Sequence, residues 1–394
     1  MAASIDVAIN FDDLRRLAKR RLPKIAYDFI EGGLEDEAGI ARNASAFEPY
    51  RLVPRYCVDV TVRDQSASVF GKTYSSPVGI APTGLIGLFR HGGDMMLAQA
   101  ARSANVPFIM SATGTGLIED LGRIAPEHGW FQLYVAKDRG ISEDMIRRAR
   151  EAGLSTLVLT LDVPINSKRE RNIRNGFVRP LKLTLKTKLE ACLHPDWMAE
   201  YLRYGMPLLA NWQRYAPAGS STAQIADFVA TQTPSPVLWK DVENFRRLWP
   251  GSLVLKGVMH PDDATRAAAM GVDGVMVSNH GARQLDRAPS PTEVLPAIHA
   301  AVGDKMTVMC DSGIRRGSDI IVALCLGAKF VFVGRHTLYG VAAGGLAGAT
   351  RALGIFKDEI DRALAQMGAP NIASLGSQFL MWRDLDDLKR NARA

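Results

Sequence analysis

The stretch DGVMVSNHGARQLD at residues 273–286 decides the fold, because a short apolar run in it ends abruptly in polar residues. The same arrangement recurs in SLVLKG at 252–257, MTVMCDSGIRRG at 306–317 and KFVFVGR at 329–335. Each run is apolar without alternation, which is typical of a parallel strand that is buried on both faces. The repetition predicts a parallel sheet whose strands end in polar side chains.

Four similar runs lie earlier in the chain, at residues 77–82, 106–111, 130–135 and 156–162. Helical patterns separate the strands, and the pattern at 262–271 ends at a glycine suited to a helix C-cap. Eight strand–helix units predict an α/β fold, namely a closed (β/α)8 TIM barrel. An open, doubly wound parallel sheet fits the same pattern and stays an alternative.

We expect the whole chain, residues 1–394, to form one domain around this barrel. Helical patterns at 11–46 and a hairpin-like region at 50–75 precede the first strand and predict a cap over the barrel. The fourth and fifth strands are separated by residues 163–251, far more than a usual crossover, which indicates a functional or disordered insertion. The predicted parts are an N-terminal cap at 1–76, the barrel at 77–340, an inserted loop at 172–240 and a C-terminal helical region at 341–394.

The composition is that of a globular protein with a large core. Apolar residues make up 47% of the 394 residues, which excludes disordered and collagen-like chains. The four cysteines are scattered without a CxxC or CxxH pair, so we expect neither a disulfide framework nor a metal site. The sequence shows no signal peptide and no uncharged apolar run long enough to span a membrane, so a cytoplasmic protein is expected.

Positive charge is concentrated in one segment. Eight basic residues and one acidic residue, Glu170, lie between Lys168 and Lys188, an excess that equals the net charge of +7 of the whole chain. The rest of the chain is balanced, which argues against a nucleic-acid-binding surface and for a local basic segment.

In a (β/α)8 barrel, chemistry lies at the carboxyl ends of the strands, and here nearly every predicted strand ends in polar residues. After the last two strands, Asp311–Gly317 and Gly334-Arg335 supply glycine amides and guanidinium groups. We therefore expect a phosphate site there rather than a pair of surface arginines.

His280 is the strongest candidate for a catalytic base, because histidine titrates near neutral pH. Arg283 can bind a carboxylate, and Asp162 can orient His280 and stabilise its protonated form. Lys256 follows the fifth strand and can form a Schiff base, bind phosphate or place positive charge beside a cofactor; these alternatives stay open. The other six histidines are expected to be structural or on the surface.

Together these residues resemble the FMN-dependent 2-hydroxy acid oxidases and dehydrogenases over nearly the whole chain. The resemblance rests on YDFIEGG at 27–33, PTG at 82–84, WFQLY at 130–134, SNHGARQLD at 278–286, DSGIRRG at 311–317 and GR at 334–335. One departure is Ala282, where the family usually has a second glycine, and the added methyl group bears on the positions of His280 and Arg283.

The resemblance implies an FMN cofactor. It implies that the flavin is contacted by Pro82, Thr83, Gly84, Ser111, Gln132, Thr160, Lys256 and Ser278. It implies that the phosphate is bound by Asp311, Ser312, Gly313, Ile314, Arg315, Gly334 and Arg335. The alternatives for Lys256 then narrow to one, in which its positive charge stabilises the reduced flavin.

The resemblance also implies an (S)-2-hydroxy acid substrate that is oxidised to the 2-keto acid. The residues that match those holding the substrate's carboxylate and hydroxyl groups are Tyr27, Tyr134, Arg169 and Arg283. His280 is implied to take the hydroxyl proton while a hydride leaves for flavin N5, with Asp162 stabilising the imidazolium. A carbanion route uses the same residues and stays open.

Within the family, residues 166–171 and 19–33 are most similar to the (S)-mandelate dehydrogenases, so mandelate or a similar aryl acid is expected. Gly84 fits the dehydrogenase members and leaves room for a bulky substrate. The HPDW segment at 194–197 is similar to bacterial lactate enzymes, so L-lactate is the second candidate. An oxidase that uses O2 is a further alternative within the family.

Membrane-bound relatives attach through the loop after the fourth strand, and here that loop combines the basic segment with apolar and aromatic residues. These are Phe177, Leu181, Leu183, Leu185, Leu189, Trp197, Tyr201, Tyr204 and Trp212. We expect peripheral binding to an anionic membrane, at the inner face of the cytoplasmic membrane, with a quinone-type electron acceptor. A solvated lid is the alternative interpretation of the loop. The family also implies a homotetramer.

Two hypotheses that assign the chain to other classes of protein stay open. Another FMN barrel enzyme, such as an isomerase or a nucleotide dehydrogenase, would share the phosphate site. A non-enzymatic barrel would use the basic segment to bind lipid or nucleic acid. The combination of His280, Asp162, Arg169 and Arg283 argues against both, and no nucleic-acid partner is expected.

Overall fold

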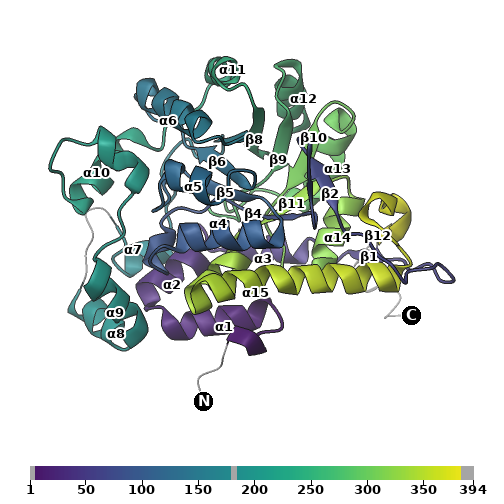
Figure 1. Ribbon diagram of the computed structural model, residues 1–394, viewed down its shortest axis with the longest axis horizontal. Coiled ribbons are helices and arrows are strands. Elements are labelled where there is room, and N and C mark those ends of the chain that lie inside the picture. The colour runs from purple at the N-terminus through teal and green to yellow at the C-terminus, as the bar shows by residue number, and fades with distance from the viewer. Residues whose placement is uncertain (1–4, 179–183, 383–394) are drawn as a thin grey trace.

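The computed structural model describes residues 5–178 and 184–382. Eight parallel strands form a closed barrel in the order β10-β11-β4-β5-β6-β7-β8-β9 (Figure 1), which confirms the predicted (β/α)8 fold. The strands are β4 (Val78–Ile80), β5 (Phe108–Ser111), β6 (Gly129–Leu133), β7 (Thr156–Thr160), β8 (Ser252–Val258), β9 (Gly274–Val277), β10 (Thr307–Cys310) and β11 (Phe330–Val333). The barrel closes where Val331 of β11 pairs with Val78 of β4.

The barrel interior is a packed core. Trp130, Phe330 and Phe332 are fully buried inside it, and the rings of Trp130 and Phe332 lie 5.3 Å apart. The hairpin β2 (Ala67–Val69) and β3 (Lys72–Tyr74) closes the amino ends of the strands with Tyr74. Since large side chains fill the interior and the hairpin covers one end, a ligand has access only from the carboxyl ends of the strands.

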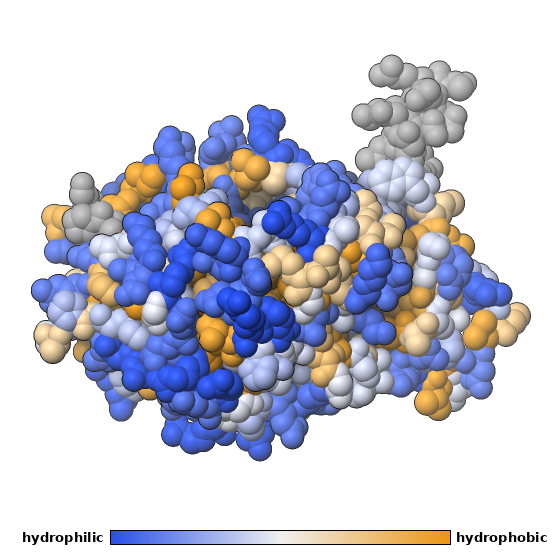
Figure 2. All heavy atoms as spheres, turned by 90° about the horizontal axis from the view of Figure 1, so that it is seen from above, coloured by the Kyte–Doolittle hydropathy of each residue, from blue (hydrophilic) through white to orange (hydrophobic). Residues whose placement is uncertain are grey.

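Helices surround the barrel (Figure 1) and bury the outward-facing residues of the strands. They are α4 (Gly93–Ala104), α5 (Ile118–Ile124), α6 (Arg139–Glu151), α11 (Trp239–Leu248), α12 (Pro261–Ala269), α13 (Pro291–Val302), α14 (Gly317–Cys325) and the long α15 (Arg335–Met367). The face drawn in Figure 2 is largely hydrophilic, and its coloured apolar residues form small patches rather than one continuous surface.

The N-terminal cap consists of α1 (Phe11–Arg21), α2 (Lys24–Glu31) and α3 (Ala38–Ser45), and α1 packs against α15. The hairpin-like region at 50–75 is only partly a hairpin. Its first strand, β1 (Tyr50–Leu52), pairs instead with β12 (Leu380–Trp382) near the other end of the chain. A three-residue strand carries too little pattern to specify so distant a partner.

The long insertion between β7 and β8 contains α7 (Glu170–Arg174), α8 (Leu185–Cys192), α9 (Pro195–Tyr204) and α10 (Thr222–Gln232) before α11. Its described part is docked onto the cap and barrel. The Trp197 indole donates to the Leu88 carbonyl at 2.7 Å, and Glu200 pairs with Arg21 at 2.6 Å and Arg90 at 2.7 Å. Among the described residues, no helix is both long and apolar enough to cross a membrane.

Candidate active site

A cavity of about 630 Å³ opens at the carboxyl ends of the barrel strands. It brings together most of the residues that the sequence predicted for the site. Those that line it are Pro82, Thr83, Gly84, Tyr134, Arg169, Lys256, His280, Arg283, Asp311, Ser312, Gly313, Ile314, Arg315, Gly334 and Arg335. Asp162, Ser111, Gln132, Thr160 and Ser278 support these residues from behind the lining, as the contacts below show.

His280 and Asp162 form a hydrogen-bonded pair, with 3.0 Å between His280 Nδ1 and Asp162 Oδ1. On the cavity side, His280 Nε2 lies 3.3 Å from the hydroxyl of Tyr134. Burial lowers the pKa of His280 below its ordinary value, and the carboxylate of Asp162 opposes that effect. Burial alone would raise the pKa of Asp162, but the charge that His280 carries when protonated, the hydrogen bond from His280 and the charge of Lys256 hold it below its usual range. The pair therefore presents a neutral imidazole backed by an ionised carboxylate.

The loop that carries His280 is held in an unusual backbone conformation. His280, Gly281 and Ala282 have positive φ values of 59°, 67° and 61°. Three hydrogen bonds from their amides secure the loop, to Ser278 Oγ at 3.1 Å, Ser312 Oγ at 2.9 Å and Asn279 Oδ1 at 3.1 Å. Positive φ at non-glycine residues is costly and concentrates at functional sites. The methyl group of Ala282 is accommodated here with His280 still bonded to Asp162.

Four guanidinium groups converge on the cavity without a carboxylate partner: Arg169, Arg283, Arg315 and Arg335. Arg283 donates to the Gly32 carbonyl at 2.6 Å, and Arg335 donates to the Ile30 carbonyl at 3.0 Å and the Gly281 carbonyl at 3.1 Å. Within the described residues, none of the four takes part in an ion pair. Burial lowers the pKa of all four, that of Arg315 to about 10.

Such an arrangement favours the binding of anions, because a buried cation without an ion-pair partner loses hydration that more distant carboxylates, such as Glu31 near Arg335, only partly offset. Arg315 and Arg335 follow β10 and β11, where the sequence predicted a phosphate. Arg169 and Arg283 lie beside Tyr134 and His280, where a carboxylate would sit. The cavity is thus built for two anionic groups at once.

A polar network underlies the cavity across consecutive strand ends. Ser111 donates to Gln132 at 2.8 Å, and Gln132 donates to Thr160 at 2.9 Å. Lys256 donates to Ser278 at 2.7 Å and pairs with Asp311 at 3.1 Å. Burial would lower the pKa of Lys256, but its two neighbouring carboxylates raise it overall, so this lysine is charged. A charged lysine and side chains that both donate and accept fit the polar edge of a flavin, and the arginines fit its phosphate.

The structure does not bring Tyr27 into this cavity. Its ring stacks against Tyr339, 6.3 Å away, on the side of α2 that faces Arg15 and Glu31. Phe29 lines the cavity instead. Phe29 points about 200° away from Tyr27 around α2, but Ile30, which also lines the cavity, points only about 60° away from it. The phase of the helix therefore does not exclude Tyr27, and its role in substrate binding stays a prediction.

Phe29 is a site residue that the sequence interpretation missed. Its ring lies under the guanidinium of Arg283, 5.2 Å from ring centre to Cζ, and meets Phe177 edge-on at 5.1 Å. Phe177 also lines the cavity. The helical phase of α2 was the available signal, since it separates residue 27 from residue 29.

Known proteins are similar to this chain over nearly its whole length. The family model for FMN-dependent dehydrogenases matches residues 18–382. The chain is 45% identical over 371 residues to (S)-mandelate dehydrogenase of Pseudomonas putida, covering 94% of this chain and 93% of that protein. It is 38% identical over 375 residues to an L-lactate dehydrogenase of Caulobacter vibrioides, covering 94% and 97%.

Solved structures of similar sequence have the same fold as this chain. A crystal structure of the monotopic membrane protein (S)-mandelate dehydrogenase superposes with a TM-score of 0.92 at 44% identity, covering 96% of this chain and all of that one. A mandelate oxidase with (S)-4-hydroxymandelic acid superposes with a TM-score of 0.82 at 32% identity, covering 95% and 98%.

Proposed function

Because the chain belongs to the FMN-dependent dehydrogenase family, we propose that it oxidises an (S)-2-hydroxy acid with an aryl side chain to the 2-keto acid. The observation that carries this proposal is the set of four guanidinium groups without carboxylate partners. Arg315 and Arg335 would hold the phosphate of FMN, and Arg169 and Arg283 the carboxylate of the substrate.

His280 is proposed as the base. It is neutral near physiological pH, and its Nε2 faces the cavity beside the Tyr134 hydroxyl. It would accept the proton of the substrate's hydroxyl group at Nε2, and Asp162 would stabilise the resulting imidazolium through Nδ1. When bound, FMN supplies the acceptor for the two electrons of the Cα–H bond. Abstraction of the Cα proton by the same nitrogen is the alternative route.

The aryl side chain is proposed from the apolar part of the cavity lining. Phe29 and Phe177 form an aromatic wall there, and Ile165 and Leu209 add apolar surface. Such a wall favours the binding of a phenyl ring over that of the methyl group of lactate. Each additional apolar group that the substrate buries there contributes roughly 1–3 kcal/mol of binding free energy. L-Lactate is the second candidate, favoured by the 38% identity to an L-lactate dehydrogenase.

The test is anaerobic mixing of the purified holoenzyme with (S)-mandelate, and separately with L-lactate, while the visible absorbance of the flavin is followed. We expect fast bleaching by mandelate and slower bleaching by lactate. The reverse order would move the assignment to lactate, and no bleaching by either acid would reject the proposed substrate class. Recovery that is slow in air and prompt with a quinone would support a dehydrogenase, whereas prompt recovery in air would make the protein an oxidase.

We also propose that α8 and α9 bind the surface of an anionic membrane. Four leucines on or beside these helices, Leu185, Leu189, Leu193 and Leu202, are between 61% and 77% exposed. Lys186 and Lys188 are exposed on the same helix as Leu185 and Leu189. Basic residues add about 1 kcal/mol each at an anionic surface. A relative with this fold is described as a monotopic membrane protein, which supports peripheral attachment.

The basic segment is less uniform than its sequence suggests. Arg169 turns into the cavity, Arg171 pairs with Glu37, and Lys168 and Arg174 both pair with Glu170. Leu181, Leu183, Arg179 and Lys182 lie outside the described residues. The membrane proposal therefore rests on α8 and α9 rather than on the total charge of the segment.

Flotation with vesicles tests this attachment. We expect the holoenzyme to float with vesicles rich in phosphatidylglycerol and not with neutral phosphatidylcholine vesicles. The double variant Leu185→Ser/Leu189→Ser should stay unbound yet keep its activity with a soluble dye, while Leu346→Ser on α15, at a leucine that is 40% exposed, should float. Equal flotation of both variants would reject the proposed membrane-binding surface.

Three further features are proposed from the family. They are a quinone acceptor, attachment at the inner face of the cytoplasmic membrane and a homotetramer. Sedimentation analysis tests the homotetramer.

A further inference from the structure

The position of Arg169 is not explained by its own contacts. Among the described residues, its guanidinium forms one side-chain hydrogen bond, from Nε to the nearby Ser167 Oγ at 3.1 Å. The residue caps α7, which has only five residues, and a helix of that length does not form without tertiary support. Another contact must therefore fix α7 and, with it, the direction of Arg169.

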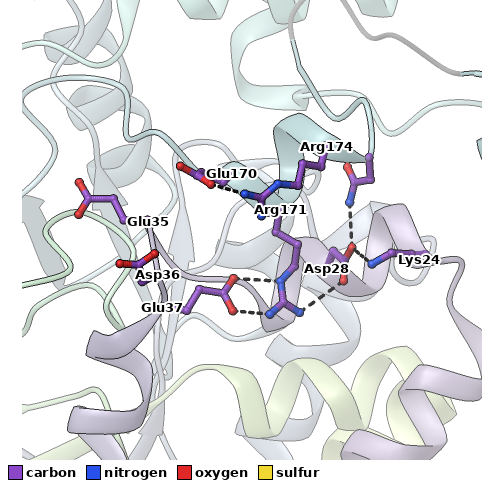
Figure 3. Close-up of a pocket in the computed structure, with 9 residues that line it drawn as sticks. Lys24, Asp28, Glu35, Asp36, Glu37, Glu170, Arg171 and Arg174 are labelled. Carbon is purple, nitrogen blue, oxygen red and sulfur yellow. Dashed lines mark hydrogen bonds and ion pairs between the residues drawn. The ribbon is translucent and has the colours of Figure 1, made fainter.

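Arg171 provides that contact from the outer face of α7. Its guanidinium forms a two-pronged ion pair with Glu37, with Nε 2.9 Å from Oε1, and lies 3.5 Å from Asp28 Oδ1 (Figure 3). The Asp28 carboxylate is 3% exposed and also accepts from Asn175 at 3.1 Å and pairs with Lys24. Two parallel N–H···O bonds fix direction as well as distance, which a lysine cannot do.

Glu37 belongs to a turn that also supports the second substrate arginine. The turn from Gly32 to Glu37 follows α2, and the Gly32 carbonyl accepts from Arg283 at 2.6 Å. Glu35 and Glu37 are left-handed, with φ values of 48° and 61°, and the Gly33 amide donates to Glu37 Oε1 at 3.2 Å. A strained turn of this kind persists only where its surroundings determine it.

We propose that Arg171 and Glu37 are positioning residues that fix α7 and so aim Arg169 at the substrate's carboxylate. The turn from Gly32 to Glu37 is then the common support of both substrate-binding arginines, one through the Glu37 carboxylate and the other through the Gly32 carbonyl. This inference rests on the proposed function, because it assigns Arg169 a carboxylate to bind. Neither positioning residue contacts the substrate itself.

The experiment compares the holoenzyme with Arg171→Gln, Arg171→Lys, Glu37→Gln and the double variant Arg171→Gln/Glu37→Gln. Each Gln variant should raise KM for the hydroxy acid about tenfold and change kcat less than twofold, because the reacting groups stay in place. The Lys variant should recover part of the loss. The double variant should resemble the single variants, since both remove one ion pair. Arg174→Gln is the matched control: it removes an exposed pair on the same helix and should change nothing.

Two further readouts separate positioning from general damage. The affinity for the 2-keto acid product should fall in the Gln variants, while that for its uncharged amide should not. Trypsin should also cleave residues 164–178 faster in these variants than in the wild type. Equal losses for acid and amide, a fall in kcat alone, or additive effects in the double variant would overturn the inference. If the wild type oxidises no 2-hydroxy acid, the proposed function fails, and the trypsin result still reports on α7.

Discussion

His280 sits between two opposing influences on its proton affinity. Burial lowers its pKa and the carboxylate of Asp162 raises it, and burial prevails. A base must be neutral to accept a proton, so activity should rise with pH through the pKa of His280. Because that pKa is lowered, the rise should be complete at a lower pH than for an ordinary histidine, whose pKa is about 6.5.

Replacing Asp162 should therefore have two separable effects. In Asp162→Asn the opposing charge is gone, so the midpoint of the acid limb should move to still lower pH. The plateau rate should fall, by about 10²-fold, because the imidazolium is no longer stabilised. Flavin reduction measured by stopped flow between about pH 4.5 and 9 checks both. A midpoint that moves to higher pH would contradict the assigned roles.

Gly257 makes room for Asp162, and this too can be tested. The glycine has a φ of 96°, and a Cβ atom there would lie 2.6 Å from both Cβ and Cγ of Asp162. Gly257→Ala should push the carboxylate away from His280 and lower the rate of flavin reduction at least tenfold. Gly271→Ala is the control, because its φ is 71° and no atom lies within 4 Å of the added methyl group. Both variants carry a backbone penalty of about 1 kcal/mol in unfolding free energy, so equal rates would reject the steric account.

For single residues, the sequence predicted the position of a side chain well where the residue lies at or just after the carboxyl end of a strand. His280, Asp162 and Lys256 could be placed because the carboxyl ends of all barrel strands meet at one mouth. Phe29 lines the cavity and Tyr27 does not, so the predicted role of Tyr27 in substrate binding stays a prediction. The left-handed backbone of Ala282 could not be predicted, since alanine rarely adopts it.

Among the elements, one buried arginine helps to fix the long insertion to the barrel. Arg148 of α6 bonds Glu119 through two nitrogens, at 2.7 Å and 2.9 Å, and donates to Asn211 of the insertion at 3.1 Å. Its side chain is 4% exposed, and Asn211 is fully buried. The insertion is thus a docked part of the fold, although its sequence resembles that of a solvated loop.

Arg148→Met should lower the free energy of unfolding by roughly 3 kcal/mol, because it removes the buried hydrogen bonds from Arg148 to Glu119 and Asn211. The catalytic constants of the folded enzyme should stay near those of the wild type, since the arginine is remote from the cavity. Denaturant titration of the holoenzyme measures the loss. Arg147→Gln removes exposed pairs with Asp144 and Glu151 from the same helix and should cost less than about 0.5 kcal/mol. Similar losses in the two variants would refute the anchoring role.

The barrel strands were predictable because each is a continuous apolar run, and burial on both faces demands such a run. β1 was expected in a hairpin, yet it pairs with β12 through contacts such as the ring pair of Tyr50 and Trp382, 4.9 Å apart. Nothing local in three residues specifies that partner. The docking of α8 and α9 was equally hidden, because it depends on single contacts such as the bond from Trp197 to the Leu88 carbonyl.

For the whole molecule, the four unpaired arginines of the cavity connect stability to ligand binding. Their burial without an ion-pair partner among the described residues opposes folding in the absence of a bound anion, and an anion that binds only the folded state stabilises it. A ligand present at 100 times its dissociation constant adds about 2.7 kcal/mol to the free energy of unfolding. Removal of FMN should therefore lower the melting temperature, and inorganic phosphate should restore part of the loss.

Arg315→Met distinguishes this effect from a general response to salt. The variant removes one guanidinium, which donates a hydrogen bond to the Ile314 carbonyl and lies over the ring of Phe11. Phosphate should raise the melting temperature of the wild-type apoprotein more than chloride does at equal ionic strength, and this excess should shrink in the variant. The apo variant should itself melt no lower than the apo wild type, because it no longer buries an unpaired charge. If phosphate and chloride act alike on the wild type, the cavity does not bind anions in the way that its geometry requires.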